Sequence, residues 1–337
     1  LLGGQRDVAP EGGTISVDRQ EEAAGIRVTL TPEAACTILS LAGSAGAPEL
    51  PERRHGAEEL VTLLLHHPTT EMVMEAERIK AGDLRAALLR FAQGEPSGLP
   101  GLNLDRIREH RKHLGERLRD VTADLSWLER ARQLAFHHLP WRHELDGEIR
   151  VFLMLLGAGL FDGEARVSGS VVEVALDLFF LSDPGDLRVV AAHEMNHAGV
   201  YLYWRGDHPQ PEARWMKLPE TMRQMGELLY LEGLARFATL GRRYRPDIEY
   251  CFAVFQEALD QARTGASPAR DDLWQGEDGE GHVGGTVGAF IFETLRRSIP
   301  DEDWDRTLRG GPEAVLNRYD PLARAQALPR LRFEAQG

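Results

Sequence analysis

The chain has 337 residues, of which 42% are hydrophobic, so it can bury the core of one large domain or of two modest ones. Its formal net charge of −14 argues against sequence-independent binding of nucleic acid or anionic lipid, because such binding requires a basic surface. No uninterrupted apolar run of about 18 residues occurs, so we expect no membrane span.

The N-terminal sequence and the cysteines both favour a cytoplasmic protein. The first residues, LLGGQRD, lack the charged and then apolar blocks of a signal peptide. Cys36 and Cys251 lie far apart in the sequence and in apolar surroundings. They predict neither a disulfide framework nor a metal-binding pair, which fits a reducing compartment.

The N-terminal part, residues 1–145, is predicted to be helical after a loose tail at 1–24 and a short strand at 25–30. Thr31-Pro32-Glu33 is typical of a helix start, with an N-cap followed by Pro at the first helical position. Further helices are expected at 58–67, 70–80 and 82–91. From 103 to about 138, apolar residues at spacings of three and four predict one buried helix face: Leu114, Leu118, Val121, Leu125 and Leu128.

The central part, residues 146–300, begins with a small mixed sheet. Residues 148–156 and 171–180 are rich in β-forming side chains, and a segment with four glycines at 157–169 separates them, so we predict two or more strands. Ser182-Asp183-Pro184 opens a helix that runs to about 203. After a loop at 205–217, helices are expected at 219–240 and 283–297. The predicted class is α+β and mostly helical, with a C-terminal extension at 301–337.

The first of these central helices contains the sequence AAHEMNH, which matches HExxH. Residues four apart on a helix share one face at about 6 Å, so His193 and His197 can bind one Zn²⁺. Glu194 can then reach a metal-activated water without binding the metal itself. The alternative is two surface histidines, but Val189-Val190-Ala191-Ala192 predicts that this helix is largely buried.

A catalytic zinc site needs a third protein ligand and an open position. Glu232, on the next helix, is the candidate, because it shares its helix face with apolar residues and a carboxylate there is costly unless a cation neutralises it. Gly233 removes a side chain where two helices must approach closely. Alternatively, Glu232 forms an ion pair with Arg236, four residues on. Asp207 and His208 in the intervening loop are further ligand candidates.

HExxH on one helix with Glu-Gly-Leu-Ala on the next resembles the gluzincin metallopeptidases, the group to which thermolysin belongs. The order strand, Gly-rich turn, strand, HExxH helix and Glu helix is similar to that of bacterial predicted zinc-dependent peptidases of this group. The resemblance covers about 146–300 and implies that this is the catalytic part. It implies one Zn²⁺ per chain held by His193, His197 and Glu232, with Glu194 as general base. The gap between His197 and Glu232 is longer than in thermolysin-like enzymes.

In such enzymes a Tyr or His on a further element donates a hydrogen bond to the tetrahedral oxyanion. His282 occupies this place here, where the related bacterial proteins often have Tyr. The small residues Gly284, Gly285 and Gly288 would let the helix that follows pack tightly. Other candidates for the oxyanion donor are Tyr201, Tyr203, Tyr230 and Arg236.

These features predict a zinc peptidase that hydrolyses an amide bond with metal-activated water and Glu194 as base. The resemblance also implies a peptide or protein substrate, bound in extended form against an edge strand. The strand at 171–180 could be that edge strand or an internal strand. A non-catalytic scaffold protein, in which zinc joins helices and His208 closes the site, is the alternative. A third is a helical protein without metal.

Overall fold

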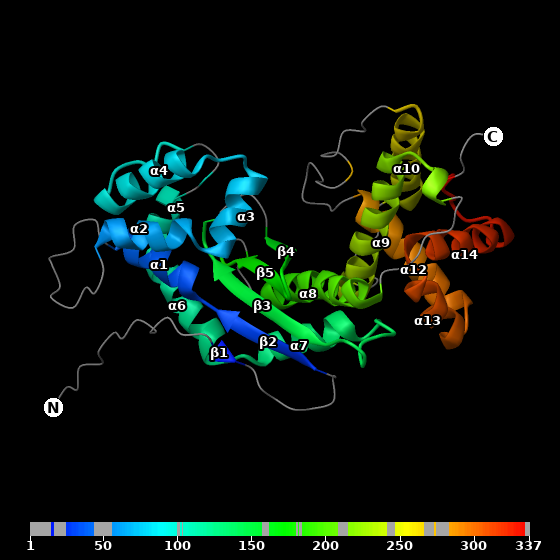
Figure 1. Ribbon diagram of the computed structural model, residues 1–337, viewed down its shortest axis with the longest axis horizontal. Coiled ribbons are helices and arrows are strands. Elements are labelled where there is room, and N and C mark those ends of the chain that lie inside the picture. The colour runs from blue at the N-terminus through cyan, green and yellow to red at the C-terminus, as the bar shows by residue number, and fades with distance from the viewer. Residues whose placement is uncertain are drawn as a thin grey trace. The chain divides into compact units, whose positions relative to one another are not determined.

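The computed structural model describes residues 15–16, 25–43, 56–99, 102, 104–156, 162–179, 181, 184–207, 215–240, 247–265, 273 and 283–333. This part of the chain is mostly helical and contains a small mixed sheet, which confirms the α+β class (Figure 1). None of its helices combines the length and the apolar character that crossing a bilayer requires. The chain divides into two compact units, of which one includes Ile26–Ala131 and Gly147–Ala191 and the other Arg132–Asp146 and Ala192–Gly337.

These units differ from the expected division at residues 145 and 300. Strand β2 (Ile26–Thr31) pairs in parallel with β3 (Gly147–Met154), so segments on both sides of residue 145 form one sheet. Helices α13 (Asp301–Arg309) and α14 (Gly311–Gln326) belong to the same unit as α9 (Glu220–Leu240) and do not form a separate extension. Contacts between distant segments define the units, and the sequence shows these contacts only indirectly.

The sheet has the strand order β1-β2-β3-β5-β4. The three central strands β2, β3 and β5 (Val171–Asp177) are parallel, whereas β1 (Ile15–Ser16) and β4 (Gly163–Ser168) pair antiparallel at the two ends. All seven residues of β5 are buried. The strand predicted at 171–180 is therefore internal, and the edge strand beside it is β4, which lies within the glycine-rich segment.

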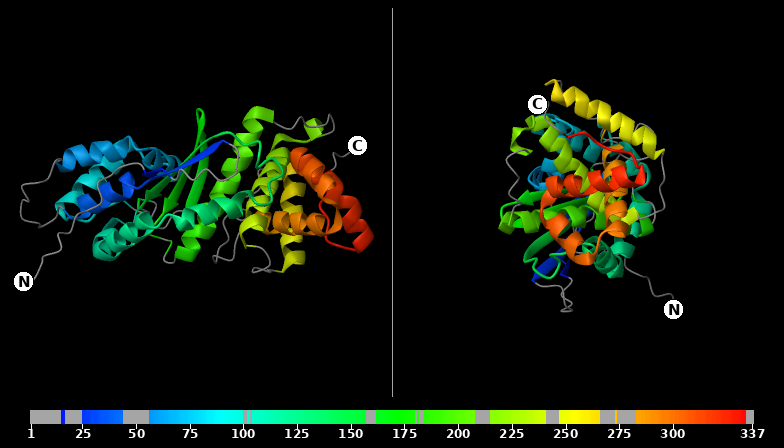
Figure 2. Two further views of the ribbon diagram at one scale, coloured as in Figure 1. Left: turned by 90° about the horizontal axis from the view of Figure 1, so that it is seen from below. Right: turned by 90° about the vertical axis from the view of Figure 1, so that its right-hand side faces the viewer.

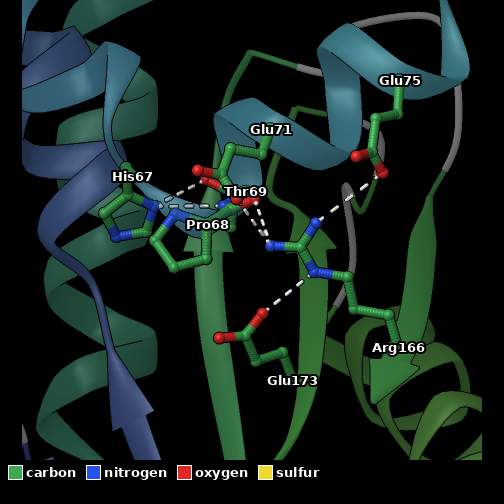
Figure 3. A network of polar contacts seen from close by, with 7 residues as sticks. All are labelled: His67, Pro68, Thr69, Glu71, Glu75, Arg166 and Glu173. Carbon is green, nitrogen blue, oxygen red and sulfur yellow. Dashed lines mark hydrogen bonds and ion pairs between the residues drawn. The ribbon is translucent and has the colours of Figure 1, made fainter. Parts of the chain in front are cut away.

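Charged side chains fasten α3 (Pro68–Ala76) to the sheet (Figure 3). Arg166 on β4 faces Glu173 on β5, with 2.9 Å between Nε and the nearer carboxylate oxygen. Its guanidinium also donates to the Pro68 carbonyl oxygen and to the Glu71 carboxylate, both at 3.2 Å, and lies 3.8 Å from Glu75. One arginine thus joins a helix and two strands.

The predicted helices before residue 100 are found with shifted ends. They are α1 (Glu33–Ala42), α2 (Ala57–Leu65), α3 and α4 (Ala81–Gln93). Pro32, and not Thr31, is the N-cap of α1. The reason is that Thr31 is the last residue of β2, where its backbone pairs with Phe152 of β3.

The single helix predicted between 103 and about 138 is wrong. The chain forms three helices there: α5 (Leu104–Glu109), α6 (Arg111–Ala123) and α7 (Ser126–Phe136). Asp124 ends α6, and its carboxylate accepts a hydrogen bond from the backbone N–H of Ser126 at 2.9 Å, where α7 begins. The periodic leucines are shared between two helices, so a continuous apolar spacing concealed a break in the backbone.

The three helices expected after residue 182 are found as α8 (Pro184–Asp207), α9 and α12 (Val283–Ser298). The second unit contains α8 from Ala192 onward, α9 and α12, and also α10 (Ile248–Arg263), α13 and α14, which the sequence had not indicated. Helices α9 and α12 lie side by side (Figures 1 and 2). They touch through their backbones, because a Cβ atom on Gly233 would lie 2.5 Å from the Cα of Gly288. The close approach predicted at Gly233 is confirmed.

Candidate metal centre

The two histidines of the HExxH sequence lie one turn apart on α8. Their ring centroids are 4.7 Å apart and their planes stand at 85° to one another. His197 is only 5% exposed, and the side chain of His193 is 23% exposed. The alanines at 191, 192 and 198 around them are completely buried. His197 in particular is therefore not a surface histidine.

Glu232 on α9 faces both rings. One of its carboxylate oxygens lies 3.2 Å from Nε2 of His193, and the other lies 3.4 Å from Nε2 of His197. One potential ligand atom from each of the three residues lies within 4.8 Å of the others, and no other group of three or more His, Cys, Asp or Glu side chains in the described ranges does so. The structure brings together the three residues that the sequence predicted as ligands.

The electrostatics of the cluster favour a positive charge between its members. Burial opposes ionisation of Glu232, but His197 and His193 outweigh it and hold the pKa of the carboxyl well below its usual range. Burial likewise opposes protonation of His197, yet the charge and hydrogen bond of Glu232, with a smaller contribution from Glu194, raise the pKa of that ring. The half-buried carboxylate of Glu232 thus stabilises a cation at the imidazole nitrogens.

The donor set fits zinc. Two imidazole nitrogens and one carboxylate are typical protein ligands of a catalytic zinc ion, which keeps a further position open. Two ligands that bind zinc tetrahedrally at about 2.1 Å lie about 3.4 Å from one another. The distances of 3.2 Å and 3.4 Å from Glu232 to the two histidines agree with this geometry.

Helix α12 packs on α9 beside Glu232. A Cβ atom on Gly285 would lie 3.5 Å from the Cβ of Glu232 and 3.6 Å from Nη1 of Arg236. Gly288 meets Gly233, the residue that follows Glu232. The tight packing predicted for this glycine cluster is confirmed at Gly288, next to the turn of α9 that carries the carboxylate.

Two more residues of the HExxH turn are buried. Glu194, the predicted general base, is 7% exposed and lies close enough to His197 for its charge to raise the pKa of that ring. Asn196 is completely buried, although we had not identified it from the sequence. A polar residue between two predicted ligands, in a helix rich in alanine, was the available signal.

Two of the predicted oxyanion donors, Tyr230 and Tyr203, make contacts of their own in the second unit. Tyr230 is buried and donates its hydroxyl hydrogen bond to the carbonyl oxygen of Leu308 at 2.8 Å. Tyr203 stacks on Trp141 with the ring centroids 4.2 Å apart. These contacts hold both tyrosines in the packing of the second unit.

Two other candidates lie beside the cluster. The ring centroid of Tyr201 is 6.4 Å from that of His197, and Arg236 follows Glu232 by one turn of α9. His282 and His208 fall outside the described residues, and so does the side chain of Asp207.

Comparisons with models of protein families, with curated proteins and with solved structures find no match to this chain. The likeness to gluzincins therefore depends on the residues of α8 and α9 alone. Any conclusion about function has to come from the chemistry of these side chains and from their geometry.

Proposed function

We propose that this chain is a zinc-dependent peptidase, in which His193, His197 and Glu232 hold one Zn²⁺ and Glu194 is the general base. The observation that carries the proposal is the position of the Glu232 carboxylate against Nε2 of both HExxH histidines. A scaffold site has no use for an acid directly after its first histidine. Here that acid is present and buried next to the cluster.

The chemistry divides between the ion and the protein. When bound, zinc lowers the pKa of a coordinated water towards 7 and polarises a carbonyl group. Glu194 accepts a proton from the attacking water at its carboxylate and returns it to the nitrogen of the leaving amine. The low exposure of Glu194 limits hydrogen bonding of bulk water to its carboxylate. The substrate class we propose is a peptide or protein bound in extended form, as in the enzymes that the two helices resemble.

Zinc content tests the metal centre. We expect about one zinc ion per chain in the purified wild type and in Glu194→Gln, loss of zinc in His193→Ala and weakened binding in Glu232→Ala, measured by elemental analysis. Glu227→Ala is a matched control, because Glu227 is exposed on the same helix and lies outside the cluster. A wild type that holds no zinc even after zinc is supplied would overturn the proposal.

Activity tests the role of Glu194. In a screen against mixed peptides, Glu194→Gln should lower the rate of amide hydrolysis by about 10² to 10⁴-fold while it keeps its zinc, because a positioned general base contributes that much. Zinc binding without hydrolysis of any peptide by the wild type would favour the scaffold function instead.

A further inference from the structure

Asn196 links the HExxH turn to the end of α7. Its Nδ2 donates a hydrogen bond of 2.6 Å to the carbonyl oxygen of Ala135, and both residues are completely buried. Ala135 lies in the last turn of α7, where carbonyl groups have no partner within the helix. The amide of Asn196 satisfies one of these carbonyls and ties α8 to α7.

Gly199 strengthens the same attachment one turn further on. A Cβ atom there would lie 2.7 Å from Cδ1 of Leu139 and 2.9 Å from Cε1 of Phe136, so the backbone of α8 packs directly on these side chains. The carbonyl oxygen of Gly199 accepts a hydrogen bond from the indole of Trp141 at 3.3 Å. On a helix with about 100° per residue, Gly199 points about 160° away from His197. Gly199 is therefore on the side of α8 opposite His197.

His197 lacks the hydrogen bond that usually orients a metal-binding imidazole. In metal sites the second ring nitrogen commonly donates to a carboxylate, a carbonyl or a water, and this bond fixes the ring. Nδ1 of His197 is buried and has no hydrogen-bond partner in the part of the chain that the structure describes. The direction of its Nε2 therefore depends on how α8 itself is rotated about its axis.

The buried amide of Asn196 is only half satisfied. Its Oδ1 is buried and accepts no hydrogen bond from the described residues, which is unfavourable in apolar surroundings. Buried polar groups that break the rules of core packing are concentrated at functional sites. A rotation of α8 that moved Asn196 off Ala135 would also turn His193 and His197 away from Glu232.

We propose that Asn196 is a positioning residue of the metal centre. Held by the Ala135 carbonyl, its amide fixes the rotation of α8 so that His193 and His197 present Nε2 to Glu232. This inference rests on the proposed zinc site. It assigns Asn196 no contact with zinc or substrate.

Zinc affinity and metal geometry test the proposal. Competition with a chromophoric chelator gives the affinity of the full chain for Zn²⁺, and the visible spectrum of the Co²⁺-substituted protein reports the ligand geometry. We expect Asn196→Ala to weaken zinc binding by about 10 to 100-fold, the usual effect of removing a group that orients a ligand, and to change the Co²⁺ spectrum. Asn196→Asp keeps the shape of the side chain but removes the Nδ2 donor. It replaces the alanine variant in these measurements if that variant does not fold.

Tyr319→Phe is the matched control. Tyr319 is buried in the same unit, and its hydroxyl donates to the Pro329 carbonyl at 2.6 Å, so the variant also loses one bond from a side chain to a carbonyl. It should lose stability but keep the zinc affinity and the Co²⁺ spectrum of the wild type. If the Asn196 variants behave in the same way, Asn196 only caps α7 and the inference is wrong. Failure of the wild type itself to bind zinc would overturn both the inference and the proposed function.

Discussion

Two glutamates of this protein, the buried Glu173 and the half-buried Glu232, are neutralised in different ways. Glu173 meets the guanidinium of Arg166, which is cationic at every relevant pH (Figure 3). Glu232 meets Nε2 of two histidines, which are cationic only when protonated and are otherwise lone-pair donors. The first arrangement is a complete ion pair. The second leaves a half-buried negative charge facing two nitrogen lone pairs, and this arrangement suits a metal ion.

A third carboxyl group, that of the buried Asp177, has neither an arginine nor a histidine partner among the described residues. Asp177, at the end of β5, is completely buried, and its Oδ2 has no hydrogen bond. Burial, with a smaller contribution from the charge of Asp162, raises its pKa to about 7, although the hydrogen bond from the Phe179 backbone N–H acts in the opposite direction. Without a cation, a buried acid retains its proton. Glu232 differs because His197 and His193 lie beside its carboxyl and hold its pKa well below the usual range.

The largest expected effect is the pH dependence caused by Asp177. Its pKa of about 7 in the folded protein exceeds its ordinary value of 3.8, so the folded state binds more protons between these values. Stability should fall as the pH rises from about 4 to 7, by on the order of 4 kcal/mol. Asp177→Asn lacks this titration and should become more stable than the wild type near pH 8. Urea unfolding at several pH values measures the difference, and parallel curves for the two proteins would contradict it.

Removing the cation from the Arg166–Glu173 ion pair should lower the free energy of unfolding almost as much. Arg166→Met leaves Glu173 charged and only 6% exposed, which should destabilise the protein by about 3 kcal/mol in urea unfolding. Glu75→Gln is the control, because this carboxylate is 79% exposed and 3.8 Å from Arg166, and the change should cost less than about 0.5 kcal/mol. The double variant Arg166→Met/Glu173→Leu should recover most of the loss, since it removes both charges.

Substitutions of Glu232 and Glu173 should differ in how far zinc stabilises the protein. At a zinc concentration about 100 times the dissociation constant, we expect the wild type to gain about 2.7 kcal/mol in thermal unfolding experiments. Glu232→Gln should lose most of this gain. Glu173→Gln should keep the gain, even if the variant starts from a lower stability. An equal response of the two variants would contradict the assignment of Glu232 as a ligand.

The smallest expected effect is proton release on zinc binding. In the metal-free protein, protonated His197 contributes stability that is fully present below about pH 6.5 and is lost as the pH rises through its raised pKa. Zinc binds only the neutral ring, so binding should release protons below the raised pKa of His197 and weaken as the pH falls. Titration calorimetry in buffers of different ionisation enthalpy counts these protons. Release that is absent at pH 7 would show that His197 is already neutral there.

The sequence by itself determined the local chemistry of the candidate site. Spacing by four residues on a helix brings His193 and His197 to one face in any fold. The Pro at 184 and the apolar residues before the motif were enough to predict a buried helix. The cost of a carboxylate in apolar surroundings pointed to Glu232, and Gly233 pointed to a close helix contact. Each of these signals depends on neighbours along the chain.

Only the tertiary structure decided how distant segments meet. It turned Glu232 towards both histidines, paired Gly233 with Gly288, joined Asn196 to Ala135 and placed β4 at the edge of the sheet. It also divided the predicted long helix, because packing and the Asp124 cap outweighed a continuous leucine spacing. These outcomes are set by contacts between residues that are far apart in the sequence, and local patterns carry no record of which distant partner each residue will meet.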